Sequence, residues 1–318
     1  MKIKKIGMLL GMGILAVGLC AGCSRQKTLD EPMDIAALNG PTGMGMAKLL
    51  HDANPNYNMS IYQSADEITG KIISGELDVA CVPSNLAPVL YNKTEKNICL
   101  LGVNTLGVLY LIENGETIKS IEDLKGQKIL ASGQGSTPEY VLNQILSKSG
   151  VLDEVKVEYY ANHTEVINAL LAGESNIALL PEPHVTIAKT KAETIRTALD
   201  LNEAWESEMG TRLPMGVIIS RKDYVEAHSK EIETFLEDYA SSVQFVNENL
   251  EEAAQMMVEA GLFEKEAIAA SAIPNAHIVF EKGQSAKEDL EGFYTVLESV
   301  NPKAIGGSMP DEAFYYGN

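Results

Sequence analysis

Apolar and polar positions along this chain follow one pattern twice. The stretch "SGELDVACVP" at 74–83 returns as "AGESNIALLP" at 172–181, with an offset of 98 residues at every matched position. The wider segments 62–83 and 160–181 share six identical residues, whereas chance at average composition would give roughly one or two. The pattern predicts that one structural unit occurs twice. The alternative is that two unrelated strand–helix–strand segments share a glycine stop and an apolar strand.

The first copy predicts a strand, a helix and a second strand. A β-rich run at 58–64 precedes a helical pattern that stops at Gly75, and the short apolar run 77–82 follows. Three isoleucines are expected on one face of this helix: Ile68, Ile72 and Ile73. The second copy repeats the same order through 155–162, 164–173 and 176–180. Strands that alternate with helices favour an α/β fold with mostly parallel sheets and helices on both faces.

Upstream of each copy, a strand runs through a glycine-rich turn into a helix. The two stretches are "DIAALNGPTGMGMAKLL" at 34–50 and "QKILASGQGSTPEYVLNQIL" at 127–146. Ligands of open α/β sheets bind at the carboxyl ends of the strands, and free N–H groups at helix starts favour an anionic or carbonyl-bearing group there. Hydroxyls of Thr42, Ser136 and Thr137 could bind the same group, and helix capping is the alternative for Ser136 and Thr137.

The order of these elements predicts two lobes with a ligand cleft between them. The first lobe is expected to comprise 33–110 and 214–318, and the second 111–213, so that the chain crosses twice and forms a hinge. The last part of the chain, which is rich in helical patterns, is expected to pack back on the first lobe. The aromatic residues at 314–316 are expected to dock there rather than to stack on a ligand.

The candidate ligand-binding residues belong to the glycine-rich turns, to the segments after the repeated A-x-x-P, and to the return crossing. They are Asn39, Gly40, Thr42, Gly43, Ser84, Asn85, Gln134, Gly135, Ser136, Thr137, Glu182 and Arg212. Arg212 is one of four arginines and could bind a carboxylate, sulfonate or phosphate through two parallel hydrogen bonds. A solvated loop arginine is the alternative. Glu182 could instead meet a cationic or amine-bearing part of the ligand.

The N-terminus has the pattern of a secretory signal. Three lysines precede an uncharged run at 6–19, which is shorter than the roughly 20 apolar residues of a membrane-spanning helix. The tetrapeptide "CAGC" at 20–23 resembles a bacterial lipobox, with cysteine in the place where leucine is usual. We therefore expect a signal peptide at 1–22, lipidation of Cys23 and a polar tether at 23–32. Redox or zinc chemistry at this C-x-x-C is the alternative.

Composition and motif content exclude several classes of function. The formal net charge is −19, and removal of 1–22 with its three lysines would make it −22, so nucleic acid is not an expected partner. No Walker, G-x-G-x-x-G or G-x-S-x-G motif is present. The five histidines lack metal-site spacing and are expected on helix surfaces, so we predict no metal, no cofactor and no catalytic residue. Cys81 and Cys99 are expected as buried free thiols, with a disulfide as the alternative.

Six stretches carry a further resemblance: the lipobox, "SIEDLKGQKIL", "GELDVACVP", "GQGSTPEYVLNQIL", "LLPEPHVTIA" and "GVIISRKDYVEAHSKEIETFL". They resemble the extracytoplasmic solute-binding proteins of ABC importers, which have the type II periplasmic-binding fold. Within that family, the likeness is greatest to the group that handles sulfonates, nitrate and thiamine-pyrimidine precursors.

The resemblance implies a lipid-anchored monomer, not an enzyme, on the extracytoplasmic face of a bacterial cell membrane. Such a protein captures a small polar organic solute, anionic solutes included, and delivers it to the membrane permease of an ABC transporter. Two alternatives stay open. One is an enzyme on the same fold, of the thiamine-pyrimidine or menaquinone pathway type, and the other is a ligand-sensing surface protein.

Overall fold

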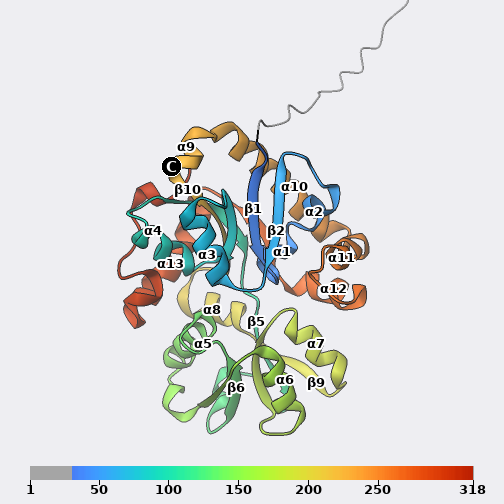
Figure 1. Cartoon of the computed structure of the whole chain (residues 1–318). Coiled ribbons are helices and arrows are strands. Elements are labelled where there is room, and N and C mark those ends of the chain that lie inside the picture. Colours follow the sequence, from blue (N-terminus) through green and yellow to red (C-terminus); the bar gives the residue numbers. More distant parts are fainter. Residues whose placement is uncertain (1–30, 318) are drawn as a thin grey trace, which may run out of the picture.

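Two α/β lobes, each built on one β-sheet, make up residues 31–317, the part of the chain that the computed structural model describes (Figure 1). The expected signal peptide and the lipidated Cys23 lie outside the described residues. Within residues 31–317, no helix is both long and apolar enough to cross a bilayer.

The first sheet has six strands in the order β11-β4-β10-β3-β1-β2. Their bounds are β1 Met33–Leu38, β2 Tyr57–Tyr62, β3 Val79–Pro83, β4 Ile98–Thr105, β10 Gly216–Arg221 and β11 Ile278–Glu281. β1 pairs in parallel with β2 and β3, whereas β10 runs antiparallel to β3 and β4, and β11 antiparallel to β4. Four of the six strands therefore point the same way, as expected for a mostly parallel sheet.

The second sheet has five strands in the order β7-β6-β8-β5-β9. Their bounds are β5 Leu109–Asn114, β6 Lys128–Ser132, β7 Lys156–Tyr160, β8 Ile177–Pro181 and β9 Ile195–Asp200. β6 pairs in parallel with β7 and β8, and β5 runs antiparallel to β8 and β9. Only β5 points against the other four strands.

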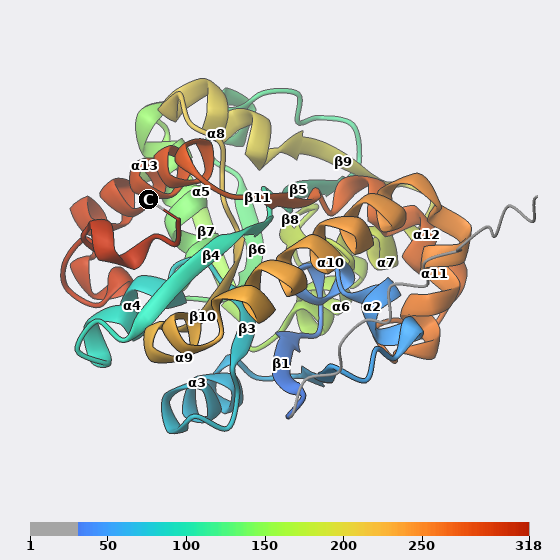
Figure 2. The same cartoon turned by 90° about the horizontal axis from the view of Figure 1, so that it is seen from above.

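Helices cover both faces of each sheet. Their bounds are α1 Pro41–Met44, α2 Ala47–Asp52, α3 Ala65–Ser74, α4 Leu86–Lys93, α5 Thr137–Lys148, α6 His163–Leu171, α7 His184–Lys191, α8 Leu201–Met209, α9 Lys222–Ala227, α10 Ser229–Glu248, α11 Leu250–Glu259, α12 Glu266–Ala272 and α13 Gln284–Val300. In the first lobe, α2, α10 and α11 share one core cluster with Ile35 and Cys81, while α3, α4 and α13 share another with Ala36 and Ala80. Figure 2 shows α10 running along the sheet with α11 and α12 beside it. In the second lobe, α5 and α8 cover one face and α6 and α7 the other.

The duplication predicted from the sequence is confirmed. The units β2–α3–β3 and β7–α6–β8 follow the same path, because in both the two strands run parallel to one central strand, β1 or β6. Gly75 and Gly173 follow the two helices with φ of 83° and 78°, which glycine adopts without strain. The expected apolar face of α3 is wrong at Ile73, which is 47% exposed although Ile68 and Ile72 are fully buried. Ile73 is adjacent to Ile72 in sequence and so lies about 100° around the helix from it.

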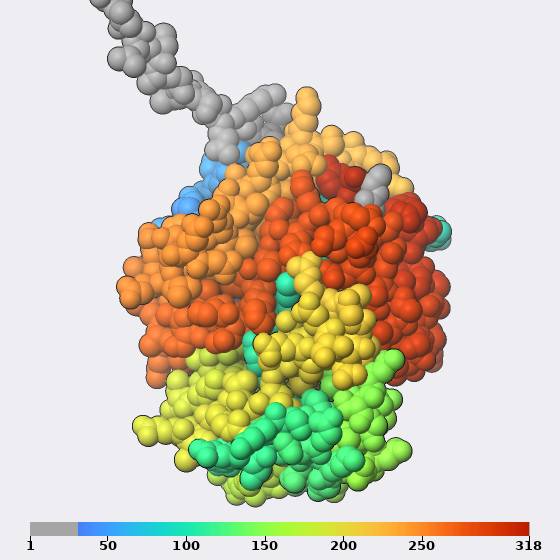
Figure 3. Space-filling view, turned by 180° about the vertical axis from the view of Figure 1, so that it is seen from behind, coloured from blue at the N-terminus to red at the C-terminus, as the bar shows by residue number. Residues whose placement is uncertain are grey.

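The chain crosses between the lobes twice, as expected, but the first crossing comes before Leu109, because Leu109 and Tyr110 belong to β5 of the second sheet. β4 leads directly to β5, and β9 returns to β10 through α8 and residues 210–215. α8 lies between the lobes, and its Trp205 packs on Phe293 of α13 with ring centroids 5.7 Å apart. Figure 3 shows this segment, in yellow, between the two lobes on the face seen from behind.

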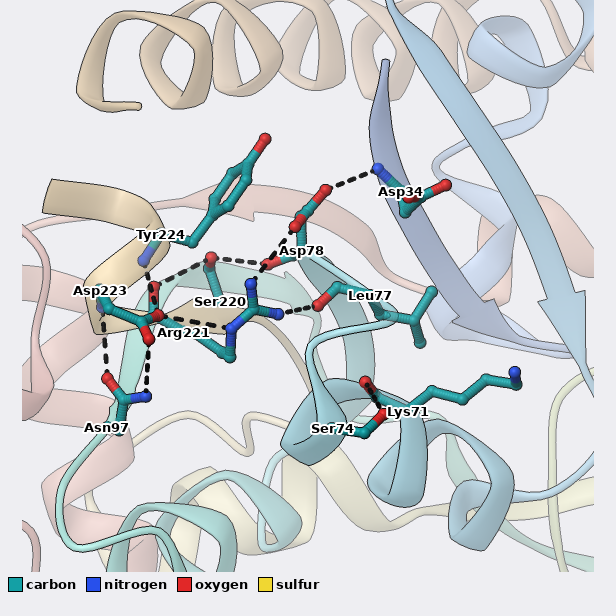
Figure 4. Close-up of polar contacts among 10 residues, drawn as sticks. All are labelled: Asp34, Lys71, Ser74, Leu77, Asp78, Asn97, Ser220, Arg221, Asp223 and Tyr224. Atoms are coloured by element: carbon teal, nitrogen blue, oxygen red, sulfur yellow. Dashed lines mark hydrogen bonds and ion pairs between the residues drawn. The ribbon is translucent and has the colours of Figure 1, made fainter. Parts of the chain in front are cut away.

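Polar contacts join β1, β3 and β10 at the end of the first sheet that lies opposite the carboxyl end of β3. Arg221 donates to the Leu77 carbonyl and forms an ion pair with Asp78 at 3.5 Å. The Ser220 hydroxyl donates to the Asp78 carbonyl (2.6 Å), and the Asp78 carboxylate accepts from the Asp34 N–H (2.9 Å). Figure 4 shows these side chains converging on Asp78. The contacts fix the base of the lobe, away from the carboxyl ends of β1 and β3.

Two smaller expectations are confirmed in the first lobe. The C-terminal aromatic residues dock there, since the Tyr316 N–H donates to the Leu100 carbonyl of β4 (2.9 Å) and the Phe314 ring packs edge to face on Tyr91. Cys81 and Cys99 are buried free thiols, and burial raises the pKa of each to about 12.

Candidate ligand-binding cleft

A cleft of about 450 Å³ opens between the lobes at the carboxyl ends of β1, β3 and β8, beside the start of α5. Both lobes line it, at the place where parallel strands of an α/β fold present their loops. Five prolines form part of its walls: Pro41, Pro83, Pro138, Pro181 and Pro183. Because the pyrrolidine ring fixes φ, these residues hold the loops around the cleft in defined conformations.

The structure brings together seven of the twelve candidate ligand-binding residues. Those that line the cleft are Asn39, Gly40, Thr42, Asn85, Ser136, Thr137 and Glu182. Those outside its lining are Gly43, Ser84, Gln134, Gly135 and Arg212.

Two of the residues outside the lining serve packing. A Cβ on Gly43 would lie 2.7 Å from the Leu38 carbonyl oxygen, so the backbone approaches too closely there for any other residue. Ser84 is fully buried, and its hydroxyl donates to the Pro214 carbonyl (2.6 Å). These side chains therefore support the turns behind the cleft.

Arg212 belongs to the hinge and not to the cleft lining. Its Nη1 donates to Glu281 Oε1 of β11 (2.7 Å), and its Nε donates to Asp289 Oδ2 of α13 (2.9 Å). Its backbone N–H also donates to Asp289 Oδ1 (3.1 Å). These hydrogen bonds, Glu281 first, raise the pKa of the Arg212 guanidinium. The arginine that the sequence suggested for an anionic ligand instead holds the return crossing on the first lobe.

The start of α5 faces the first lobe through Ser136 and Thr137. Ser136 occupies the N-cap position, but its hydroxyl donates to the Gly133 carbonyl (2.5 Å) and makes no capping hydrogen bond. The Thr137 hydroxyl donates to Asn85 Oδ1 of the first lobe (3.1 Å). The capping alternative is thus wrong for these side chains, and Thr137 with Asn85 forms a direct hydrogen bond between the lobes.

The first-lobe side of the cleft is fixed by contacts around Thr42. Its hydroxyl donates to the Leu38 carbonyl (3.4 Å), and its own carbonyl accepts from Asn104 Nδ2 (3.2 Å). Asn39 Nδ2 donates to Gln63 Oε1 (3.5 Å), and Gln63 also lines the cleft. The sequence pattern did not single out Gln63, because the predicted β-rich run at 58–64 included it, whereas β2 ends at Tyr62 and Gln63 follows the strand.

Two histidines are the main feature of the cleft that the sequence pattern did not predict. His163 and His184 are the first residues of α6 and α7, and both line the cleft, with ring centroids 4.4 Å apart. His163 Nδ1 lies 2.6 Å from the Ser132 hydroxyl oxygen, and His184 Nδ1 is buried with no hydrogen-bond partner among the described residues. Burial lowers the pKa of both, to about 4 for His184, where His163 contributes as well. The rings are therefore neutral at pH 7, and the expectation of helix-surface histidines is wrong for this pair.

Glu182 directly follows β8 and lines the cleft, although it is only 1% exposed. Its carboxylate accepts from the N–H and the hydroxyl of Thr186, both at 3.1 Å. Burial raises the pKa of Glu182, and the contacts with Thr186 and the charge of Lys189 offset part of that rise. Across residues 31–317, no group of three or more His, Cys, Asp or Glu side chains is arranged to hold a metal ion, so the carboxylate and the two imidazoles do not form such a group.

Two α/β lobes joined by two crossings, with a cleft at the strand ends between them, define this chain as a protein of the type II periplasmic-binding fold. It belongs to the family described as menaquinone biosynthesis, whose model matches residues 50–295. No protein with a curated description matches the chain.

Solved structures show the same architecture. An ABC transporter from Parabacteroides distasonis is 26% identical, with a TM-score of 0.79 over 90% of this chain and 99% of that chain. The periplasmic aliphatic sulphonate binding protein SsuA from Escherichia coli is 16% identical, with a TM-score of 0.68 over 88% and 96%. The periplasmic nitrate-binding protein NrtA from Synechocystis PCC 6803 is 12% identical, with a TM-score of 0.57 over 76% and 70%. The likeness to the last two is one of fold alone.

Proposed function

We propose that this chain is the solute-binding lipoprotein of an ABC importer, which captures a small polar organic solute between its lobes and delivers it to a membrane permease. The observation that carries the proposal is a cleft of about 450 Å³ that both lobes line and a hydrogen bond bridges. A solute that contacts both lobes stabilises the closed arrangement relative to an open one.

The proposal includes a place for the protein in the cell. Lipidation at Cys23 would anchor a monomer to the extracytoplasmic face of a bacterial cell membrane, with the lobes beyond a short tether. The support is the sequence pattern of a charged start, an apolar run and a lipobox at 1–23. The strongly acidic composition also favours a small solute over nucleic acid as the partner.

We further propose that the seven candidate residues lining the cleft contact the solute, together with Gln63, His163 and His184. The hydroxyls and amides among them come from both lobes, so a bound solute would complete hydrogen bonds that neither lobe provides alone. Neutral imidazoles can donate at one nitrogen and accept at the other, which suits a polar organic molecule.

The second candidate is an enzyme on the same fold, which the description of the chain's family favours. The cleft contains groups that can exchange protons, namely Glu182 and the two histidines. Catalysis would require one of them to reach a reacting atom of the substrate, whereas a receptor releases its solute unchanged.

A thermal-shift screen followed by analysis of the bound compound separates the two candidates. Purified mature protein is tested against sulfonates, pyrimidines, nitrate, amino acids and riboflavin-like compounds, because a solute that binds the folded state alone raises the melting temperature. Each compound that stabilises the protein is then incubated with it and recovered for mass spectrometry. Recovery without chemical change supports the receptor, conversion to a product supports the enzyme, and the absence of any stabilising compound counts against the receptor.

A further inference from the structure

The ionisable side chains that line the cleft are one carboxylate and two neutral imidazoles, and neither lysine nor arginine is among the lining residues of the described chain. We propose that Glu182 recognises a positively charged group of the solute. The cleft then takes a small organic cation, such as a protonated amine or an amidine. This inference rests on the proposed receptor function and specifies the chemical class of its solute.

Within residues 31–317, Glu182 differs from the other buried carboxylates in forming no ion pair, although the charge of Lys189 acts on it. Four acidic side chains between residues 31 and 317 are buried: Asp78, Glu113, Glu182 and Asp289. Three of them pair with an arginine: Asp78 with Arg221 (3.5 Å), Glu113 with Arg196 (2.5 Å) and Asp289 with Arg212 (2.6 Å). Figure 4 shows the first of these pairs. These are all the arginines of the described chain, and an unpaired buried charge is costly, so a bound cation would supply what Glu182 lacks.

Glu113 shows how a carboxylate of purely structural role is satisfied in the same lobe. It is equally buried, at 1% exposed, and its two oxygens accept four hydrogen bonds, from the N–H and hydroxyl of Thr117, the N–H of Ile118 and the guanidinium of Arg196. A carboxylate has about four acceptor sites, so Glu113 has none left. Glu182 accepts two hydrogen bonds, both from Thr186, so about two of its acceptor sites have no donor.

The surroundings of Glu182 also favour a cation over an anion. The glycine-rich turn before α5 could otherwise bind an anionic ligand, but its Gly135 N–H already donates to the carboxylate of the protein's own Glu139 at 2.5 Å. His163 and His184 are neutral at pH 7 and bring no opposing positive charge. The formal net charge of −19 attracts cations to the protein and repels anions.

Matched probes that differ only in charge test the inference. Benzamidine, benzamide and benzoate have nearly the same size and shape but carry a positive, a zero and a negative charge. Further triplets of matched cation, neutral compound and anion on other carbon skeletons extend the set. Each is titrated at pH 7 into the full mature chain by calorimetry and ligand-observed NMR. We expect the cation of a triplet to bind at least about tenfold more tightly than its anion, because the anion would face Glu182.

Two variants assign the preference to Glu182. Glu182→Gln keeps an acceptor for Thr186 and removes the charge, so it should weaken benzamidine binding about tenfold or more and change benzamide binding by less than about threefold. Glu193→Gln removes the same charge from an exposed position of the second lobe and should change neither. The melting temperature of ligand-free Glu182→Gln should equal or exceed that of the wild type, because no internal ion pair is lost.

The outcomes separate this inference from the function on which it rests. Anions that bind as tightly as their matched cations, or a cation preference that survives in Glu182→Gln, would overturn the inference while leaving a receptor in place. If no member of any triplet and no compound of the wider screen binds, both the receptor function and the inference are rejected.

Discussion

Replacement of Arg212 by glutamine should lower the stability of the protein without changing solute binding. The guanidinium makes five hydrogen bonds, to Glu281, Ser285 and Asp289, and glutamine can replace at most a fraction of them. The side chains of Arg212, Glu281 and Asp289 are 31%, 29% and 12% exposed, so the cluster is neither a surface pair nor a fully buried one. Exposed pairs contribute up to about 1 kcal/mol, and breaking a buried pair costs about 3–5 kcal/mol. We therefore expect a loss of about 2–3 kcal/mol in the free energy of unfolding, or roughly 3–5 °C in melting temperature for a chain of this length.

The measurement is urea unfolding of the wild type and Arg212→Gln, together with calorimetric titration of the solute identified by the screen. Lys282→Gln is the matched control, because Lys282 pairs with Glu233 at 3.3 Å but both side chains are about half exposed. The control should lose less than about 1 kcal/mol. Solute affinity should be the same in all three proteins within about threefold. A variant of normal stability that binds the solute tenfold more weakly would show that Arg212 belongs to the ligand site after all.

Three further predictions concern the anchor, the cleft and acid stability. Cys23→Ala should abolish palmitate labelling and detergent partitioning, and unlipidated wild-type protein in the culture medium would contradict the anchor. Thr42→Ala and Thr137→Ala should each weaken solute binding by about 0.5–3 kcal/mol in calorimetry, and unchanged affinity in both would place the binding site elsewhere. Burial, and then His163, lowers the pKa of His184 from 6.5 to about 4, so the unfolded chain takes up a proton first as the pH falls through this window. The free energy of unfolding of the wild type should therefore fall by about 3 kcal/mol between pH 7 and pH 4 because of this group, and His184→Gln should lack this fall. Denaturant unfolding at a series of pH values measures both proteins, and an equal fall in the two would disprove the prediction.

The fold could be predicted because its determinants are local and repeated. Alternating strands and helices with glycine stops at Gly75 and Gly173 specify the unit, and the 98-residue offset specifies its repetition. Ile73 is the exception, because a run of two apolar residues on a helix does not reveal which of them faces the core. Pairing partners of β10 were beyond local reasoning, since they depend on contacts between strands more than 100 residues apart.

The site was harder to predict than the fold because its chemistry depends on distance in space. His163 and His184 are 21 residues apart, with no metal-site spacing between them, yet the parallel placement of β7 and β8 on either side of β6 brings the helices that follow them together. Arg212 was a candidate ligand-binding residue for the same reason, since its true partners are distant in sequence. Its acidic partners Glu281 and Asp289 lie about 70 residues further along the chain, where no local pattern connects them to the return crossing.

The hydrogen bonds between the lobes affect how fast a solute can bind. Besides the contact of Thr137 with Asn85, the Tyr110 hydroxyl donates to the Asn275 carbonyl (2.8 Å), and Asn301 Nδ2 donates to the Tyr140 hydroxyl (2.9 Å). Each tyrosine belongs to the second lobe and each of its partners to the first. Three neutral hydrogen bonds at roughly 1 kcal/mol each would favour the closed arrangement of the empty protein by about 3 kcal/mol. The lobes would then be apart for no more than about one per cent of the time. The association rate would then be set by how often the lobes part rather than by how often a solute arrives, so capture would be slow even where binding is tight.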